Sequence, residues 1–228
     1  MHAEGRIEQA RLAYERAVYA GDHGVLSEAE RELDKVEADL ALARGRILHA
    51  RFLEERREDS AELALMERAA HLYRRLGDVA GEAEALFWVG CFYQIIRGDS
   101  DAAIPLLEQS RELALQVGDL GIQSEVLRHL GIADHSAGRL DSAREKLEES
   151  VRLRQRIELW AGVAANQVGL IYIAAAQGRR DDALALAEEA YAIAEACGAE
   201  RIVRQIDEAR AQIQAPGNRS ERGPAEDT

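Results

Sequence analysis

The chain is poor in aromatic residues, proline and cysteine, and it has no long hydrophobic run. Aromatic residues make up 5% of its 228 residues, with three prolines and two cysteines, Cys91 and Cys197. Two thiols far apart in apolar stretches form neither a disulfide framework nor a metal cluster, so we expect both to be buried. No apolar run approaches the roughly 20 residues that cross a bilayer, and no secretory signal precedes the first helix. We therefore expect a cytoplasmic protein without membrane contact.

Basic residues are also few beside the acidic ones. The 29 lysines and arginines stand against 42 aspartates and glutamates, which leaves a net charge of −13. A surface this acidic repels phosphate backbones, so we expect no nucleic-acid partner. The sequence contains no HExxH pair, nucleophile elbow or phosphate-cradling glycine loop. We therefore expect no metal, no cofactor and no enzymatic activity.

What the chain does contain is a repeat. A glycine is followed five residues later by an alanine in four segments that begin at Gly5, Gly98, Gly138 and Gly178. Apolar residues at helical spacing follow each opening. These helices run into a second glycine that suits a left-handed helix end, at Gly77, Gly118 and Gly198, while Glu158 occupies the remaining slot. The later alanines, Ala103, Ala143 and Ala183, are 40 residues apart.

A second kind of helix is expected between these, over residues 82–97, 121–137 and 161–177. Each has a glycine near its middle, at Gly90, Gly131 and Gly169. A glycine inside a helix costs about 1 kcal/mol relative to alanine. Three glycines at matching places therefore predict that a neighbouring helix crosses closely there, beside the small alanine of the partner helix.

At these positions the sequence resembles the tetratricopeptide repeat in its 40-residue form, the type found in bacteria and in kinesin light chains. The matching pattern is a large apolar residue, then Leu-Gly or Val-Gly, an aromatic residue three later, and the alanine. It is read in Leu86/Val89/Gly90/Tyr93/Ala103 and Ala165/Val168/Gly169/Tyr172/Ala183. The resemblance implies an all-α, right-handed solenoid of antiparallel helix pairs over residues 59–198, with a capping helix at 199–214. The tail at 215–228 is polar and contains proline and glycine, so we expect it to be disordered.

The middle repeat departs from the pattern at Asp134, which stands where an aromatic residue is expected. A carboxylate in that slot needs a buried partner such as an arginine, or it leaves a void that admits water.

The N-terminal part, residues 1–58, contains a helix at about 5–20 and an insertion. Within the insertion, apolar residues alternate spacings of three and four through Leu26, Ala29, Leu33, Val36, Leu40, Ala43, Ile47 and Ala50. This pattern predicts one long helix, about 28–56, with a coiled-coil-like seam, and Ser27 with Glu30 suits a capping box at its start. Gly45 lies off the seam, where it could bend the helix. Either the seam covers the helices of the next repeat, or Leu33, Leu40 and Ile47 pair with a second copy as a homodimer interface.

The resemblance also implies a concave groove lined by the first helix of each pair. Alignment on the mid-helix glycines nominates Glu84, Phe87, Cys91, Gln94, Glu125, Arg128, Ile132, His135, Asn166, Leu170 and Ile173. Arg128 and Asn166 could hydrogen-bond a peptide backbone or carboxylate, and Phe87 with Trp88 offers an apolar pocket. In related repeats, such as those of kinesin light chains, an asparagine in the Asn166 slot lines the peptide groove.

Three functions remain open. The first is a non-catalytic scaffold or regulatory adaptor that binds a protein or peptide in the groove. The second is homo-oligomeric assembly through the long N-terminal helix. The third is a small-molecule binder or enzyme around Arg128, Asp134 and His135, although the titratable cluster of Glu125, His129, Asp134 and His135 does not converge on one face.

Overall fold

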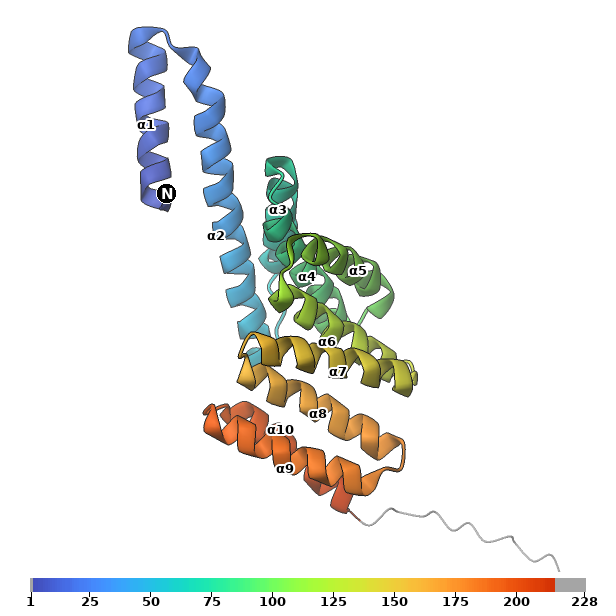
Figure 1. Cartoon of the computed structure of the whole chain (residues 1–228). Coiled ribbons are helices and arrows are strands. Elements are labelled where there is room, and N and C mark those ends of the chain that lie inside the picture. The colour runs from blue at the N-terminus through green and yellow to red at the C-terminus, as the bar shows by residue number, and fades with distance from the viewer. Residues whose placement is uncertain (1, 216–228) are drawn as a thin grey trace, which may run out of the picture. The chain divides into compact units, whose positions relative to one another are not determined.

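The computed structural model describes residues 2–215, in which every regular element is helical (Figure 1). The α-helices are α1 (Ala3–Ala20), α2 (Leu26–Glu55), α3 (Ala61–Leu76), α4 (Val79–Cys91), α5 (Ser100–Val117), α6 (Leu120–Ser136), α7 (Leu140–Arg156), α8 (Trp160–Ala176), α9 (Arg180–Ala196) and α10 (Glu200–Gln214). The expected all-α fold of antiparallel helix pairs is confirmed. None of the described helices is long and apolar enough to cross a membrane. The predicted disordered tail lies, apart from Ala215, outside the described residues.

The chain divides into two compact units, Met1–Ile157 and Glu158–Thr228. In the first unit each of the helices α1 to α6 packs on the helix that follows it in the chain. In the second unit α10 packs on both α8 and α9. The core of that unit is rich in alanine, and α10 contributes Ile206 and Ala209 to it as fully buried residues. Cys197, expected to be buried, is exposed in the turn before α10, whereas Cys91 is buried.

The expected left-handed turns are present at the ends of the helices. Gly77 and Gly118 have φ angles of 71° and 69°, and each is followed by an aspartate that caps the next helix. The carboxylates of Asp78 and Asp119 accept the backbone N–H three residues on, at 3.0 and 2.9 Å. Glu158 fills the same slot with a φ of 56°, so this turn closes in the left-handed conformation without a glycine.

Close helix crossings account for the mid-helix glycines of the first unit. A Cβ atom on Gly90 would lie 2.8 Å from Leu107, and one on Gly131 would lie 3.1 Å from Leu147. Gly45 has the same role, because its Cβ would lie 2.9 Å from Met66 on α3. The helix α2 is therefore continuous through Gly45, and α2 with α3 forms one more closely crossed pair. The predicted capping box is wrong, because α2 begins at Leu26 without a side-chain cap.

One repeat is a residue longer than the others. Gly77 and Gly118 are 41 residues apart, whereas Gly98, Gly138 and Gly178 follow one another at intervals of 40. The extra residue is absorbed by a π-helical segment, Phe92–Ile96, at the end of α4. Single π turns of this kind accommodate an insertion without breaking the helix.

The predicted alignment of the three mid-helix glycines is wrong for Gly169. The turn residues Gly118 and Glu158 are 40 residues apart, so the counterpart of Gly131 is Ile171. Burial agrees with this shift of two residues, since Ile171 is fully buried like the other residues at close crossings. By the same alignment Asn166 corresponds to the fully buried Val126, and not to Arg128.

Asp134 is buried and has the arginine partner that its position demanded, although Arg139 itself is half-exposed. Its Oδ1 accepts a hydrogen bond from Arg139 Nε at 2.8 Å, and its Oδ2 accepts from Ser142 Oγ at 2.6 Å and Lys146 Nζ at 2.5 Å. Burial alone would raise the pKa of Asp134, but the hydrogen bonds from Lys146, Ser142 and Arg139 outweigh it and hold the pKa at about 2. The expectation of a paired carboxylate is confirmed, and the group ties α6 to α7.

Candidate functional site

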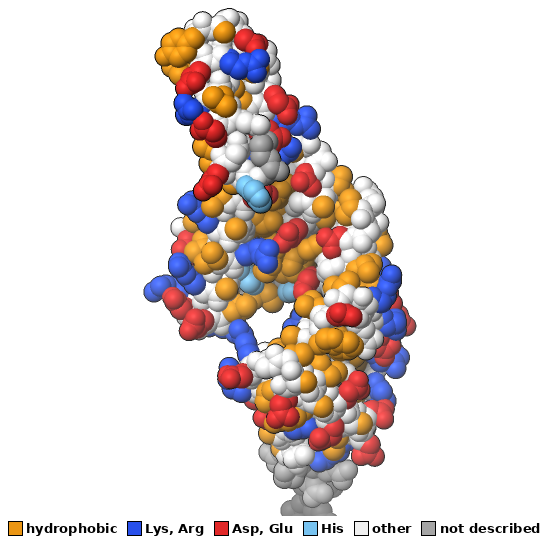
Figure 2. All heavy atoms as spheres, turned by 60° about the vertical axis from the view of Figure 1, so that its left-hand side comes forward, with side chains coloured by type: hydrophobic (Ala, Val, Ile, Leu, Met, Phe, Trp, Pro, Cys, Tyr) orange, Lys and Arg blue, Asp and Glu red, His pale blue; other side chains and the backbone are white. Residues whose placement is uncertain are grey.

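The candidate site lies in the first unit, where α2, α4 and α6 come together. We call the partly exposed side chains here the inner surface, and they are Arg46 on α2, Glu84 and Trp88 on α4, and Glu125 and Arg128 on α6. Charged side chains of both signs, hydrophobic side chains and histidines gather in the middle of the view in Figure 2. The inner surface is thus neither purely apolar nor of a single charge.

A row of aromatic rings in edge-to-face contact underlies the inner surface. His49 on α2 meets Trp88 edge to face with ring centroids 5.4 Å apart, and Trp88 meets Phe87 at 5.2 Å. Phe87 then meets His129 on α6 at 5.3 Å. Edge-to-face contacts of this kind favour one relative orientation of the rings. The row therefore fixes α2, α4 and α6 relative to one another.

Trp88 is the centre of the inner surface. The guanidinium carbon of Arg46 lies 5.5 Å from the centre of the Trp88 ring, and Arg46 also forms a salt bridge of 2.9 Å with Glu84. Arg46 remains half-exposed in this position. The indole Nε1 of Trp88 is buried and has no acceptor among the described residues. Buried indole N–H groups usually have a partner, so this donor is an unusual feature of the site.

His129 is held as a neutral, half-buried imidazole. Its Nδ1 lies 2.5 Å from Gln94 Oε1, and Gln94 Nε2 donates back to the His129 carbonyl oxygen at 2.9 Å. Burial, with the charges of Arg128, His49 and Arg154, lowers the pKa of His129 to about 3. Nδ1 therefore carries the proton that Gln94 Oε1 accepts.

Cys91 lies against the same imidazole, with its Sγ 3.5 Å from His129 Nε2. Burial, and next the charge of Glu125, raises the pKa of the Cys91 thiol. A reactive cysteine needs the opposite, a thiolate stabilised beside a protonated base. The pair is a thiol and a neutral imidazole, so its geometry does not supply a nucleophile.

A second buried pair, His49 and Glu62, stands behind Trp88. His49 Nδ1 lies 2.9 Å from Glu62 Oε1, and both side chains are buried. Burial, with the charges of Asp59 and Glu58, raises the pKa of Glu62 to about 7, and burial lowers the pKa of His49. Both shifts favour uncharged side chains, so below about pH 7 the pair consists mainly of two neutral partners that share a hydrogen bond.

The predicted groove residues divide into two groups in the first unit. Phe87, Cys91 and Gln94 are only 3%, 1% and 9% exposed, because the packing of α4 on α6 covers them. They lie beneath the surface and not along an open groove. The partly exposed members are Glu84, Glu125, Arg128, Ile132 and His135.

On α8, the predicted Asn166, Leu170 and Ile173 are all buried, at positions that match the packing residues of α6. The alignment shifted by two residues explains this difference. A ligand-binding role for the predicted set stays a prediction.

Glu125 is paired with Arg154, a contact that the sequence did not indicate. The side chains of Arg154 and Glu125 meet at 2.6 Å, and the Arg154 side chain is almost fully buried. Burial lowers the pKa of Arg154, although the Glu125 carboxylate opposes this shift. Glu125, His129 and Asp134 therefore each have different partners, and the described residues contain no group of three potential metal-ligating side chains.

Arg46 and His49 were missed in the sequence. The insertion before α3 interrupts the 40-residue period, so the alignment of the mid-helix glycines did not include Gly45 on α2. Gly45 is the signal that could have found them, because Arg46 and His49 follow it by one and four residues, as Cys91 and Gln94 follow Gly90.

The seam of α2 lies on a different face from the one that packs on α3. The helix buries Ala38, Ala41, Leu42, Gly45 and Phe52, whereas Leu33, Leu40 and Ile47 are 39%, 48% and 55% exposed. The interpretation that the seam covers the next repeat is therefore wrong for these three residues. The alternative, pairing with a second copy, stays a prediction at this point.

Comparison with known proteins agrees with the fold. Residues 81–156, which hold α4 to α7, match the family described as tetratricopeptide repeat. No match was found among curated proteins. Tetratricopeptide repeats mediate protein–protein interactions and scaffolding. Residues 81–156 are therefore similar to tetratricopeptide repeats, and the neighbouring helix pairs of the first unit cross in the same close, antiparallel way.

Proposed function

We propose that the first unit is a non-catalytic adaptor that binds an extended segment of a partner protein on its inner surface. The observation that carries this proposal is Trp88, a partly exposed aromatic ring with a buried and unmatched N–H donor, placed between charged residues of both signs. Aromatic residues and arginine dominate the energetics of protein interfaces.

The chemistry of the inner surface suits a peptide. Arg46 and Arg128 donate hydrogen bonds of the kind that carbonyl and carboxylate groups accept, whereas Glu84 and Glu125 accept from backbone N–H groups or basic side chains. The Trp88 ring offers apolar contact to one large side chain of the peptide. Because Arg46 is half-exposed, movement of its guanidinium would uncover the ring for that contact.

The electrostatics of the buried groups favour binding over catalysis. Cys91 and His129 are held in uncharged forms by burial, and Glu62, whose pKa is about 7, is fully buried, so none of the three lies on the exposed part of the inner surface. A general base or nucleophile would need to be poised near neutral pH within reach of a substrate. These residues fix the helices instead.

The proposal is tested with peptides selected from a random phage-displayed library on the purified chain. A Trp160→Phe background leaves Trp88 as the only tryptophan, so its fluorescence reports binding at the inner surface. We expect selected peptides to shift this fluorescence, and Arg46→Glu to weaken their binding at least about tenfold.

The matched control is Arg68→Glu. Arg68 lies on α3, is exposed to a similar degree, and pairs with Glu37 at 2.7 Å away from Trp88. It should leave peptide affinity unchanged. Selected peptides that bind without any change in Trp88 fluorescence, or equal losses in the two variants, would refute the inner surface as the binding site.

A further inference from the structure

The seam of α2 is an exposed apolar row on a helix whose other side is already packed. Leu33, Leu40 and Ile47 recur every seven residues, and the small residues Ala43 and Ala50, also exposed, lie between and after them. A spacing of seven keeps side chains on one stripe that another helix can cover. Hydrophobic side chains are visible between acidic and basic ones along the α1–α2 hairpin in Figure 2.

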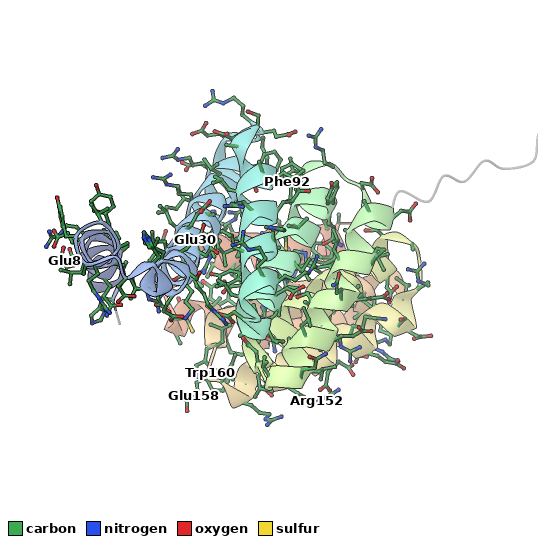
Figure 3. The ribbon with its side chains drawn as sticks, turned by 90° about the horizontal axis from the view of Figure 1, so that it is seen from above. Glu8, Glu30, Phe92, Arg152, Glu158 and Trp160 are labelled. Atoms are coloured by element: carbon green, nitrogen blue, oxygen red, sulfur yellow. The ribbon has the colours of Figure 1, made fainter. Side chains whose placement is uncertain are left out.

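The helix α1 covers only the first part of this stripe. Viewed from above in Figure 3, α1 stands on the far side of α2 from the other helices of the unit. It packs near the start of α2, where Arg6 forms a 2.9 Å salt bridge with Glu32 and where Ala29 and Val36 are half-buried. From Leu40 onward the stripe is exposed. On its own outer side α1 adds further exposed apolar residues at Ile7, Tyr14 and Val18.

The charges beside the seam have a fixed order. Glu30, Glu37, Arg44 and Arg51 also recur every seven residues, and all four are exposed. The first two are acidic and the last two are basic. Glu37 contacts Arg68 at 2.7 Å, whereas Glu30, Arg44 and Arg51 form no ion pair with the described residues. The row therefore changes sign near the middle of the helix.

We propose that α2 pairs with α2 of a second copy of this chain in the antiparallel direction. In that direction Glu30 faces Arg51 of the second copy and Glu37 faces Arg44, so that all four flanking contacts join opposite charges. In a parallel pair each of these residues would instead lie beside the same residue of the second copy, so that like charges would meet. Flanking charges set the orientation of paired helices in this way.

The same arrangement matches the apolar residues. With the charges paired in this way, Leu40 lies opposite Ala43 of the second copy, and Leu33, which stays 39% exposed beside α1, lies opposite Ala50. Large residues therefore meet small ones, which allows two helices to approach closely. The contact uses the same patch on both copies, as a two-fold symmetric dimer requires. Because α1 packs on the start of α2, the contact extends over Leu33 to Ala50, about 26 Å at 1.5 Å per residue.

A second copy fits this surface better than an unrelated partner because the charge row is complementary to itself. The pairing does not involve the inner surface, so it stands independently of peptide binding.

The first test is solution mass by light scattering, over roughly 1–100 μM protein. We expect the full chain to reach twice the 25.2 kDa of one copy. The triple variant Leu33→Gln, Leu40→Gln, Ile47→Gln should remain monomeric and keep its helical circular dichroism, because these side chains are exposed. A monomer at every concentration in the full chain, or a dimer that persists in the triple variant, would overturn the proposal.

Charge variants test the pairing without touching the apolar residues. Arg51→Glu should raise the dimer dissociation constant at least about tenfold at low salt, because it places two acidic groups together. Adding Glu30→Arg to the same chain restores opposite charges and should restore the dimer. A double variant as weak as Arg51→Glu alone contradicts the contact between Glu30 and Arg51.

Cross-linking separates the two directions. In a Cys197→Ser background, which removes the exposed native thiol, Ala43→Cys should form a disulfide between copies because Ala43 lies near the symmetry axis. Leu33→Cys should not, because the two copies of residue 33 lie toward opposite ends of the paired helices. Cross-linking of both variants would indicate a parallel pair and refute the antiparallel one.

Discussion

Replacing Glu62 by glutamine is expected to stabilise the first unit at alkaline pH and to change its stability little below pH 5. Glu62 is fully buried beside His49, and its pKa is raised from 4.5 to about 7. A carboxyl group with a raised pKa contributes stability below its unfolded value, and this contribution is lost as the pH rises through the folded value. Wild-type stability therefore falls between about pH 4.5 and pH 7 on account of Glu62.

The magnitude follows from the size of the shift. A change of one pKa unit corresponds to about 1.4 kcal/mol, so well above pH 7 the buried carboxylate costs about 3 kcal/mol. Glutamine carries no charge at any pH, and its amide oxygen can still accept the hydrogen bond from His49 Nδ1. His49 itself has a lowered pKa, so its contribution is present above pH 6.5 and is lost at lower pH. Wild type and the Glu62→Gln variant both lose this contribution of His49, so it cancels in the difference between their free energies of unfolding.

The assay is urea unfolding at half-unit steps from pH 5 to pH 8.5, followed by Trp88 fluorescence in the Trp160→Phe background. Trp88 contacts His49, so its signal reports this part of the chain. The matched control is Glu67→Gln, an exposed glutamate on the same helix. We expect the Glu62 variant to gain stability over wild type progressively with pH and the Glu67 variant to show no trend. A gain that is independent of pH would refute the reasoning, as would a loss that grows with pH.

Three further changes test single contacts by urea unfolding. Gly90→Ala should cost about 1–3 kcal/mol despite the helix preference of alanine, since its Cβ would lie 2.8 Å from Leu107; no loss would mean that α5 moves away freely. Asp134→Asn should cost about 1–2 kcal/mol at pH 7, less than the full shift implies because its basic partners are partly exposed. The stability difference between wild type and Asp134→Asn should shrink as the pH falls from 4 toward 2. A difference that stays constant over this range would contradict the lowered pKa of Asp134. Glu158→Gly should stabilise the chain by a few tenths of a kcal/mol to about 1 kcal/mol, because it relieves a left-handed φ of 56°.

The repeat explains why so much of the fold could be predicted. The backbone requires left-handed turn residues every 40 residues and, in the first unit, glycines at the close crossings, so both appear directly in the sequence. The helix predicted at 5–20 extends over Ala3–Ala20, and the one predicted at 28–56 extends over Leu26–Glu55. The errors arise where the period is interrupted. The π-helical segment is one extra residue, and Gly169 lies two residues from the crossing.

The site was harder to predict than the fold because exposure depends on neighbouring helices. Cys91 and Arg46 occupy equivalent positions after their mid-helix glycines, yet Cys91 is buried and Arg46 is half-exposed. The difference is that α6 packs over α4, while α2 leaves its corresponding position open to Glu84 and Trp88. Position within a repeat therefore identifies candidates, but the contacts between successive repeats decide which of them a ligand can reach.

The two proposed surfaces share α2 without competing for it. Arg46 points to the inner surface through its contacts with Glu84 and Trp88, whereas Leu40 and Ile47 form the exposed seam on another face. If both proposals hold, a dimer carries two inner surfaces on one rigid helix pair. A partner with two binding segments would then be held more tightly than one with a single segment, by a factor that reflects effective concentration and not new contacts. The triple seam variant separates the two effects, because it should abolish this gain while leaving the affinity for a single peptide unchanged.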